Sequence, residues 1–201
     1  AAPEWGYAAG GLFIAMGGGT TDVALVRNGG IEATRMFPIG GRVFTKKLAS
    51  RFGISFADAE AVKLRHSKGE LPQAHGEKVH AVLSRDAEVL VEGIASTLQE
   101  MAKGDRLPAA VYLAGGGSAL PEVREQLGIF PWAEKLPFAR TPAVHVLRPV
   151  DIRGIYDSTG LLLDQQDITP MGLAFHAVQQ QSEEQAPLFG LMRKVLKVMR
   201  V

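Results

Sequence analysis

The sequence predicts an α/β fold, a β-sheet with flanking helices. Three short β-rich runs, over residues 12–16, 23–27 and 31–37, are separated by glycine-rich turns, which is typical of an antiparallel meander. A further apolar run over 109–113 enters a glycine loop and is followed by apolar residues at helical spacing. The chain thus combines a meander with a strand, loop and helix unit, and this combination defines the predicted class.

Two helices follow the meander. Pro38 to Gly41 breaks the third strand, and apolar residues at helical spacing then run over 43–52 to a stop at Gly53. Ser55 is a candidate N-cap for a second helix, with Asp58 three residues further on. That helix ends in the polar residues 65–69.

The middle of the chain carries a weaker pattern. Residues 70–86 contain a proline, a glycine and two histidines without a clear period, so we expect a loop with at most one short strand or helix start. Residues 87–101 have the spacing of an amphipathic helix. After a strand over 144–147, residues 155–166 are irregular and a short helix follows near 173–178.

A glycine-rich hairpin joins the first two strands. It consists of Gly17, Gly18, Gly19, Thr20 and Thr21. Glycines can reach positive φ and leave their amides uncovered, and threonine hydroxyls add donors for phosphate oxygens. Two interpretations stand from these residues alone: a phosphate-binding turn, or a glycine hairpin that holds no ligand.

A second glycine loop lies between a strand and a helix. Gly115, Gly116, Gly117 and Ser118 follow the run over 109–113, and this order directs backbone amides and a helix N-terminus at the loop, which favours an anion or nucleotide. The alternative is a tight turn that needs small residues. Ser118 has no nucleophile-elbow motif around it, so no catalytic residue is predicted.

Composition limits the remaining possibilities. The 201 residues include 22 basic and 21 acidic ones, a net charge of +1, so we expect no nucleic-acid partner. There is no cysteine, and the five histidines show no pair at metal-ligand spacing, so metal binding is not expected. No apolar run is long enough to cross a bilayer, and the start at Ala1 without methionine indicates a fragment.

The end of the chain has a different composition. Residues 179–186 predict a polar linker, and residues 187–201 a basic amphipathic helix suited to an anionic membrane surface. Its expected membrane-facing residues are Leu188, Leu191, Met192, Arg193, Lys194, Val195, Lys197 and Met199. Docking on the chain's own lobe, or continuation into a further domain, are the alternatives.

Four motifs in order resemble FtsA, the bacterial actin-like cell-division family. They are Gly17 to Asp22, Phe37 to Gly41 with its following helix, Asp58 to His66, and Ala114 to Ser118. The likeness covers roughly residues 11–178. It implies an actin-like (ribonuclease H-like) second lobe of a two-lobed protein that closes on ATP, with Mg²⁺ as a weaker expectation.

The resemblance also implies a domain organisation and site roles. A larger subdomain would comprise 11–52 and 107–178, with a small, mainly helical subdomain inserted at 53–106. Gly18 to Thr21 would face the β- and γ-phosphates, beside Gly17 and Gly41. Glu60 and Lys63 would lie near the ribose and adenine, unless they form only a surface ion pair, and Gly115 to Ser118 would complete the adenosine pocket.

The sequence departs from the family pattern twice. Relatives usually carry an aspartate where Ala15 stands, and that residue orients metal and water, so we expect nucleotide binding with slow or absent hydrolysis. Residues 68–86 are short and irregular where FtsA usually has a strand-rich insertion that meets the tail of FtsZ. This weakens the expectation of FtsZ binding and favours a relative such as the pilus protein PilM.

The sequence therefore predicts an ATP-binding, at most slowly hydrolysing protein that forms filaments on the cytoplasmic face of the membrane. Its expected partners are further copies of itself, FtsZ or another division or envelope protein, and an anionic membrane surface. The alternatives are a PilM-like assembly protein, or a kinase or chaperone-type ATPase of the same superfamily.

Overall fold

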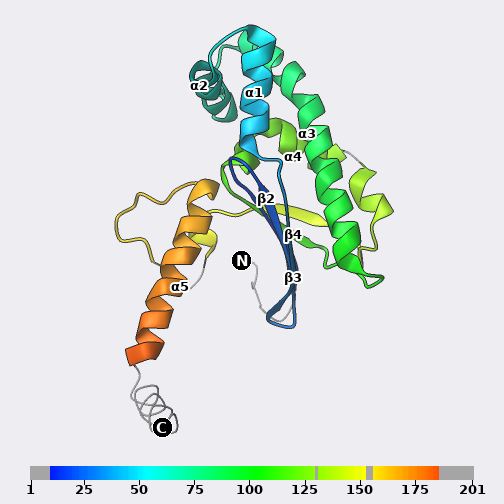
Figure 1. The fold of residues 1–201 in the computed structure, drawn as a ribbon, viewed down its shortest axis with the longest axis vertical. Helices are drawn as coiled ribbons and strands as arrows, with labels where there is room; N and C mark the ends of the chain where they lie inside the picture. Colours follow the sequence, from blue (N-terminus) through cyan, green and yellow to red (C-terminus); the bar gives the residue numbers. More distant parts are fainter. Residues whose placement is uncertain (1–9, 130, 153–155, 186–201) are drawn as a thin grey trace, which may run out of the picture.

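The protein is built on one five-stranded mixed sheet (Figure 1). The computed structural model describes residues 10–129, 131–152 and 156–185. The strands are β1 (Gly11–Met16), β2 (Thr21–Arg27), β3 (Gly30–Phe37), β4 (Ala110–Ala114) and β5 (Ala143–Val146), in the order β3-β2-β1-β4-β5. β1, β2 and β3 pair antiparallel, whereas β4 runs parallel to both β1 and β5. The predicted α/β class with a mixed sheet is confirmed.

Five α-helices accompany the sheet in the described residues. They are α1 (Gly41–Phe52), α2 (Phe56–Ser67), α3 (Gln73–Ala102), α4 (Pro121–Ile129) and α5 (Ile168–Gln185), with short 3₁₀ turns that include η1 (Gly116–Ala119), η2 (Pro131–Lys135) and η4 (Gln165–Asp167). Gly53 ends α1 in the left-handed region at φ 65°. Ser55 caps α2, because its side chain accepts a hydrogen bond from the amide of Asp58. Both helix boundaries agree with the capping signals.

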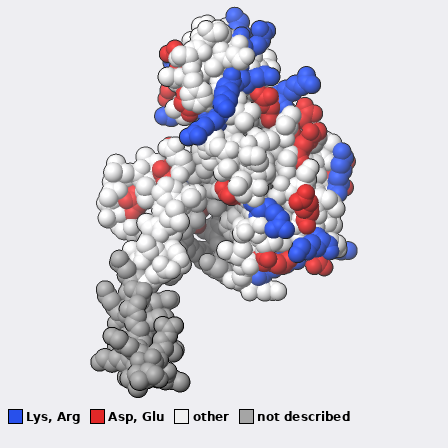
Figure 2. All heavy atoms as spheres, viewed as in Figure 1, with Lys and Arg blue, Asp and Glu red and all other residues white. Residues whose placement is uncertain are grey.

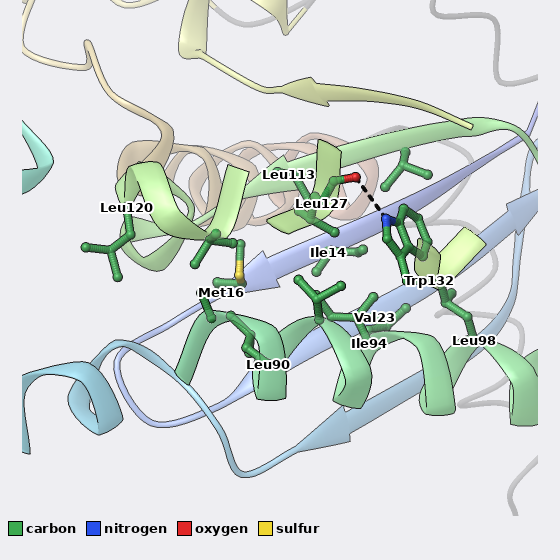
Figure 3. Close-up of a cluster of buried hydrophobic side chains, with 14 of the residues drawn as sticks. Ile14, Met16, Val23, Leu90, Ile94, Leu98, Leu113, Leu120, Leu127 and Trp132 are labelled. Atoms are coloured by element: carbon green, nitrogen blue, oxygen red, sulfur yellow. Dashed lines mark hydrogen bonds between the residues drawn. The ribbon is translucent and has the colours of Figure 1, made fainter. Parts of the chain in front are cut away.

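The core lies between the sheet and the helices α3 and α4 (Figure 3). Alternate residues of β1 point into it, and α3 contributes residues at helical spacing. The indole Nε1 of buried Trp132 donates to the carbonyl oxygen of Leu127 at 2.9 Å, which satisfies the one polar atom of that side chain. The labelled members of this cluster are Ile14, Met16, Val23, Leu90, Ile94, Leu98, Leu113, Leu120, Leu127 and Trp132.

The expected loop over 70–86 is wrong, because α3 begins at Gln73 and runs for 30 residues. Val79 and Leu83 are buried and continue the apolar stripe of the later turns. Gly76 lies in the first turns of this helix, where a Cβ would meet no neighbouring atom, and the helical backbone continues through it. It interrupts the apolar periodicity of the sequence but not the helix. Packing of the stripe against neighbouring elements outweighs the cost of Gly76, which is about 1 kcal/mol relative to alanine.

The last described helix is longer than expected. α5 extends to Gln185 and so includes most of the predicted linker, whose glutamines and glutamates are good helix formers. The predicted membrane helix over 187–201 lies outside the described residues. No helix among those described combines the length and apolar character that crossing a membrane requires. The proposed subdomain boundaries stay a prediction, and the later turns of α3 pack on the sheet.

Candidate functional site

The two glycine loops lie together at one edge of the sheet. β1 and β4 are parallel neighbours, with Ala15 paired to Ala114, so the loops that follow their carboxyl ends emerge side by side. The contact is close: a Cβ on Gly115 would lie 2.4 Å from the carbonyl oxygen of Met16. Carboxyl ends of adjacent parallel strands are a common place for ligand binding in α/β folds.

The first loop is fastened to the N-terminus of α1. The Gly17 amide donates to the Thr20 carbonyl at 2.9 Å, which closes the turn. The amide of Gly41 donates to the Gly17 carbonyl at 2.9 Å, and that of Arg42 to the Gly18 carbonyl at 2.7 Å. The positive end of the α1 dipole is therefore held against the loop.

The glycines of this loop leave the backbone uncovered by side chains, and they do not adopt the positive φ that glycine allows. None of the three has a positive φ. All three are exposed, and a Cβ on Gly19 would meet no heavy atom within 4 Å. Within the described chain the amides of Gly18 and Gly19 donate to no protein acceptor, so both are free for a ligand.

The two threonines of the loop have different surroundings. Thr20 is partly exposed, with its hydroxyl 3.4 Å from a carboxylate oxygen of Asp22. Thr21 is fully buried, and its hydroxyl donates to the Ile39 carbonyl at 2.7 Å. In this conformation Thr21 holds the turn together and its hydroxyl proton is not available to a phosphate, so Thr20 is the better candidate for that role.

The second loop is constrained by packing. Gly115 has φ 82° and, like Gly117, is buried against Met16, where a Cβ would come within 2.9 Å. The Ser118 hydroxyl is buried and donates to the Gly115 carbonyl at 2.8 Å. Only Gly116 of these four residues is exposed. The tight-turn interpretation therefore explains Gly115 and Gly117, and Gly116 remains open to a ligand.

Lys63 anchors a polar network next to the first loop. Its Nζ lies 3.1 Å from the Gly41 carbonyl, 2.9 Å from the Thr45 hydroxyl and 2.9 Å from a carboxylate oxygen of Glu60. Thr45 also donates to that same oxygen. Glu60 and Lys63 do form an ion pair, but Lys63 is buried, so this is not a pair on the surface.

The electrostatics of the network favour an ionised Glu60. Burial acts to raise the pKa of Glu60, but the hydrogen bonds from Thr45 and Lys63 and the positive charges of Lys63 and Arg42 outweigh it. The pKa of Glu60 therefore lies below its ordinary value. The structure brings Gly41, Glu60 and Lys63 together as one unit at the start of α1.

Two features of the site were not predicted. Arg42, in the first turn of α1, would have its Nε 3.6 Å from a Cβ on Gly18, so a guanidinium lies beside the loop. A signal for it existed, because the arginine directly follows the Gly40-Gly41 pair. Ala15 pairs across the sheet with Asp22, so a carboxylate stands next to the position where the family resemblance implies one.

Similar solved structures identify the class of fold. The chain is similar to a PilM-PilN type IV pilus biogenesis complex, with TM-score 0.59 and 22% identity over 84% of this chain and 46% of that one. It is also similar to MreB 5 of Spiroplasma citri bound to AMPPNP, with TM-score 0.51 and 17% identity over 89% and 56%. The protein has the actin-like fold.

The family follows from the sequence comparison. The model of the cell division protein FtsA matches residues 12–128, and this chain belongs to the FtsA family. The cell division protein FtsA of Pseudomonas aeruginosa is 27% identical over 191 residues, which covers 84% of this chain and 42% of that protein. The chain spans less than half the length of the curated relatives it matches.

Proposed function

We propose that this FtsA-family protein binds ATP, with the phosphates on residues 17–20 and the adenosine toward the second glycine loop. One observation carries the proposal: two glycine loops, the N-terminus of α1 and the Lys63 network meet at one edge of the sheet. The exposed Gly18 and Gly19 amides supply donors for phosphate oxygens.

Charge supports the same assignment. The guanidinium of Arg42 lies beside Gly18, and arginine binds phosphate oxygens through directed hydrogen bonds. Lys63 and Glu60 face each other behind Gly41, where they hold the start of α1 in place for the ligand. The similar MreB 5 structure is described as bound to AMPPNP, an ATP analogue.

A substitution at the most open glycine tests the proposal. Gly19→Asp adds a carboxylate where a Cβ meets no atom, so the fold should tolerate it while the charge repels phosphate. Gly128→Asp in α4 is the matched control, because its Cβ space is equally open. We expect calorimetric titration with ATP to show binding to the control and at least about tenfold weaker binding to Gly19→Asp, equivalent to about 1.4 kcal/mol. Equal affinity of the two variants would refute the phosphate assignment.

We further propose that hydrolysis is slow or absent. Mg²⁺ would be organised by carboxylates, and Ala15 supplies none, which leaves the neighbouring Asp22 as the nearest one on the paired strand. Phosphate release at an ordinary turnover rate by the wild-type protein would contradict this part of the proposal.

The proposed cellular role is assembly on the cytoplasmic face of the membrane, through filaments of this protein and the basic amphipathic residues 187–201. Liposome co-sedimentation of the intact chain and of a chain ending at Ala186 tests the membrane step, and equal binding of the two would reject it. Pelleting with and without ATP and lipid tests assembly.

The proposed protein partner is FtsZ or another division or envelope protein. The inserted segment 53–106, all of it described, holds helices and no strand, unlike the strand-rich insertion expected for FtsZ contact. In Figure 2 basic and acidic side chains are interspersed along α3, so the face in view offers a mixed and not a uniformly basic surface, which supports a protein partner over nucleic acid. Titration with the FtsZ C-terminal peptide separates FtsZ from the other partners.

A further inference from the structure

Three titratable side chains from three helices meet at the junction of α2, α3 and α4. They are His66 at the end of α2, His80 in α3 and Glu122 in the first turn of α4, here called the His–Glu cluster. Nε2 of His66 lies 2.5 Å from Oε1 of Glu122, and Nδ1 of His80 lies 3.2 Å from the same oxygen. One ligand atom from each residue falls within 4.8 Å of the others. The histidine spacing in the sequence predicts no metal site.

Glu122 is the unusual member of the cluster. Its side chain is fully buried, and within the described chain its Oε2 atom has no hydrogen-bond partner. A buried carboxylate oxygen without a donor carries a large desolvation cost. Among the described residues no lysine or arginine forms an ion pair with Glu122, and its polar side-chain partners are the two histidines. A bound cation would satisfy this carboxylate.

The cluster opens into a pocket with the charge that a cation needs. The pocket has a volume of about 420 Å³, and both histidines line it together with Glu77 and Glu125. Glu125 is close enough to His80 for a contact of 3.4 Å between Oε2 and Nε2. Among the described residues no lysine or arginine lines this pocket, and its two glutamates favour a positive ion over an anion such as a phosphate.

We propose that the His–Glu cluster is a binding site for a divalent transition metal ion of the zinc type. Two imidazole nitrogens and one carboxylate form a ligand set that such ions take, and three protein ligands leave a coordination position open to the pocket. This site is separate from the proposed ATP site, and its test does not depend on nucleotide.

The coordination requires only a local adjustment. Ligand atoms of a tetrahedral zinc site lie about 3.3 Å apart, given bonds of about 2.0 Å. The distance of 3.2 Å between His80 Nδ1 and Glu122 Oε1 fits this spacing. The distance of 2.5 Å between His66 Nε2 and the same oxygen is too short for it. A small opening of the His66 contact removes the conflict, and the three ligand atoms already lie within 4.8 Å of one another.

A metal at this position would join three segments that are far apart in the sequence. It would tie the end of α2 and the first half of α3 to α4, directly after the second glycine loop (Figure 1). An ion that binds only the folded chain stabilises it by mass action. Bound metal should therefore raise the melting temperature.

Titration of the full chain with Zn²⁺, and with Co²⁺ as a spectroscopic probe, tests the site. His80→Gln removes one of the three ligands. Because the His80 side chain is 40% exposed, the variant should fold. His176→Gln in α5 is the matched control, because that histidine is exposed and outside the cluster. We expect one ion per chain for the wild type and the control, and at least about tenfold weaker binding to His80→Gln, since even outer-shell changes cost 10- to 100-fold.

Glu122→Gln is a second variant, which keeps the size of the side chain and removes its charge. Loss of the Co²⁺ absorption band and of the metal-induced rise in melting temperature in both cluster variants supports the site. Equal affinity of wild type and His80→Gln overturns it. So does the lack of saturable one-to-one binding by a wild-type chain freed of metal by a chelator.

Discussion

Gly40→Ala is the sharpest test of how the phosphate-loop candidate is held. A Cβ on Gly40 would lie 2.7 Å from the Gly17 carbonyl oxygen, 2.8 Å from the Thr20 amide nitrogen and 2.9 Å from the Gly18 carbonyl carbon. All three are backbone atoms, so no side-chain rotation relieves the contact. Gly40 has φ −155°, an extended conformation open to alanine, so the added methyl group itself is the perturbation.

The cost can be worked out from the contacts. Overpacking of this kind costs about 1–3 kcal/mol. Displacing the loop also weakens the two hydrogen bonds to α1, each with a net value of about 1 kcal/mol. In the opposite direction, alanine restricts the unfolded chain, which stabilises the folded protein by about 0.4–1 kcal/mol. Because the two costs share one displacement, we expect a net loss of about 1–3 kcal/mol.

Denaturant and thermal unfolding measure this loss. For a chain of this size, 1–3 kcal/mol lowers the melting temperature by about 2–12 °C. Gly19→Ala is the matched control, because its Cβ has open space and its φ is not positive. It should be as stable as the wild type or up to about 1 kcal/mol more stable, since it gains the same restriction of the unfolded chain without the contacts. Gly40→Ala as stable as Gly19→Ala would refute the reasoning.

Three further predictions concern single side chains. Lys63→Met leaves Glu60 without its buried partner and should lower the free energy of unfolding by about 1–3 kcal/mol at pH 7. Because the pKa of Glu60 is lowered in the folded protein, the difference between variant and wild type in urea unfolding should shrink as the pH falls below 4.5. Asp86→Asn should raise the melting temperature at pH 7, because burial raises the pKa of Asp86 and disfavours its charged form. The rise in melting temperature should vanish below pH 3.8, where the carboxyl is protonated in the folded and the unfolded chain. Ala15→Asp should increase Mg²⁺-dependent phosphate release, whereas Ala24→Asp on the same face should not, and equal rates would contradict the role given to position 15.

Local signals explain most of the fold that could be predicted. The meander, α1 and α2 each have a boundary marked by a glycine or a capping serine, and those residues act within one turn of the backbone. The first half of α3 has a less distinct signal. Val79, Leu83 and Ala87 stand four residues apart, which is helical spacing, but Gly76 and the two nearby histidines obscure the pattern, and only their burial makes it plain.

The candidate sites also contain features that the sequence predicts and features that only the fold brings together. The glycine loops were visible as motifs, but the burial of Thr21 follows from its place as the first residue of β2, directly after the turn. The His–Glu cluster was not predictable from spacing, because Glu122 is 56 residues from His66 and 42 from His80. Only the packing of three helices brings these side chains together.

The length of α3 has a consequence for stability. Its 30 residues form one uninterrupted helix of about 45 Å, with His80 near one end and Met101 of the sheet-facing core at the other. Buried residues run along the whole helix, from Val79 to Ala102, so both ends are held in one continuous core. An ion or partner that binds at His80 would therefore add its stabilisation to the same helix that packs on the sheet.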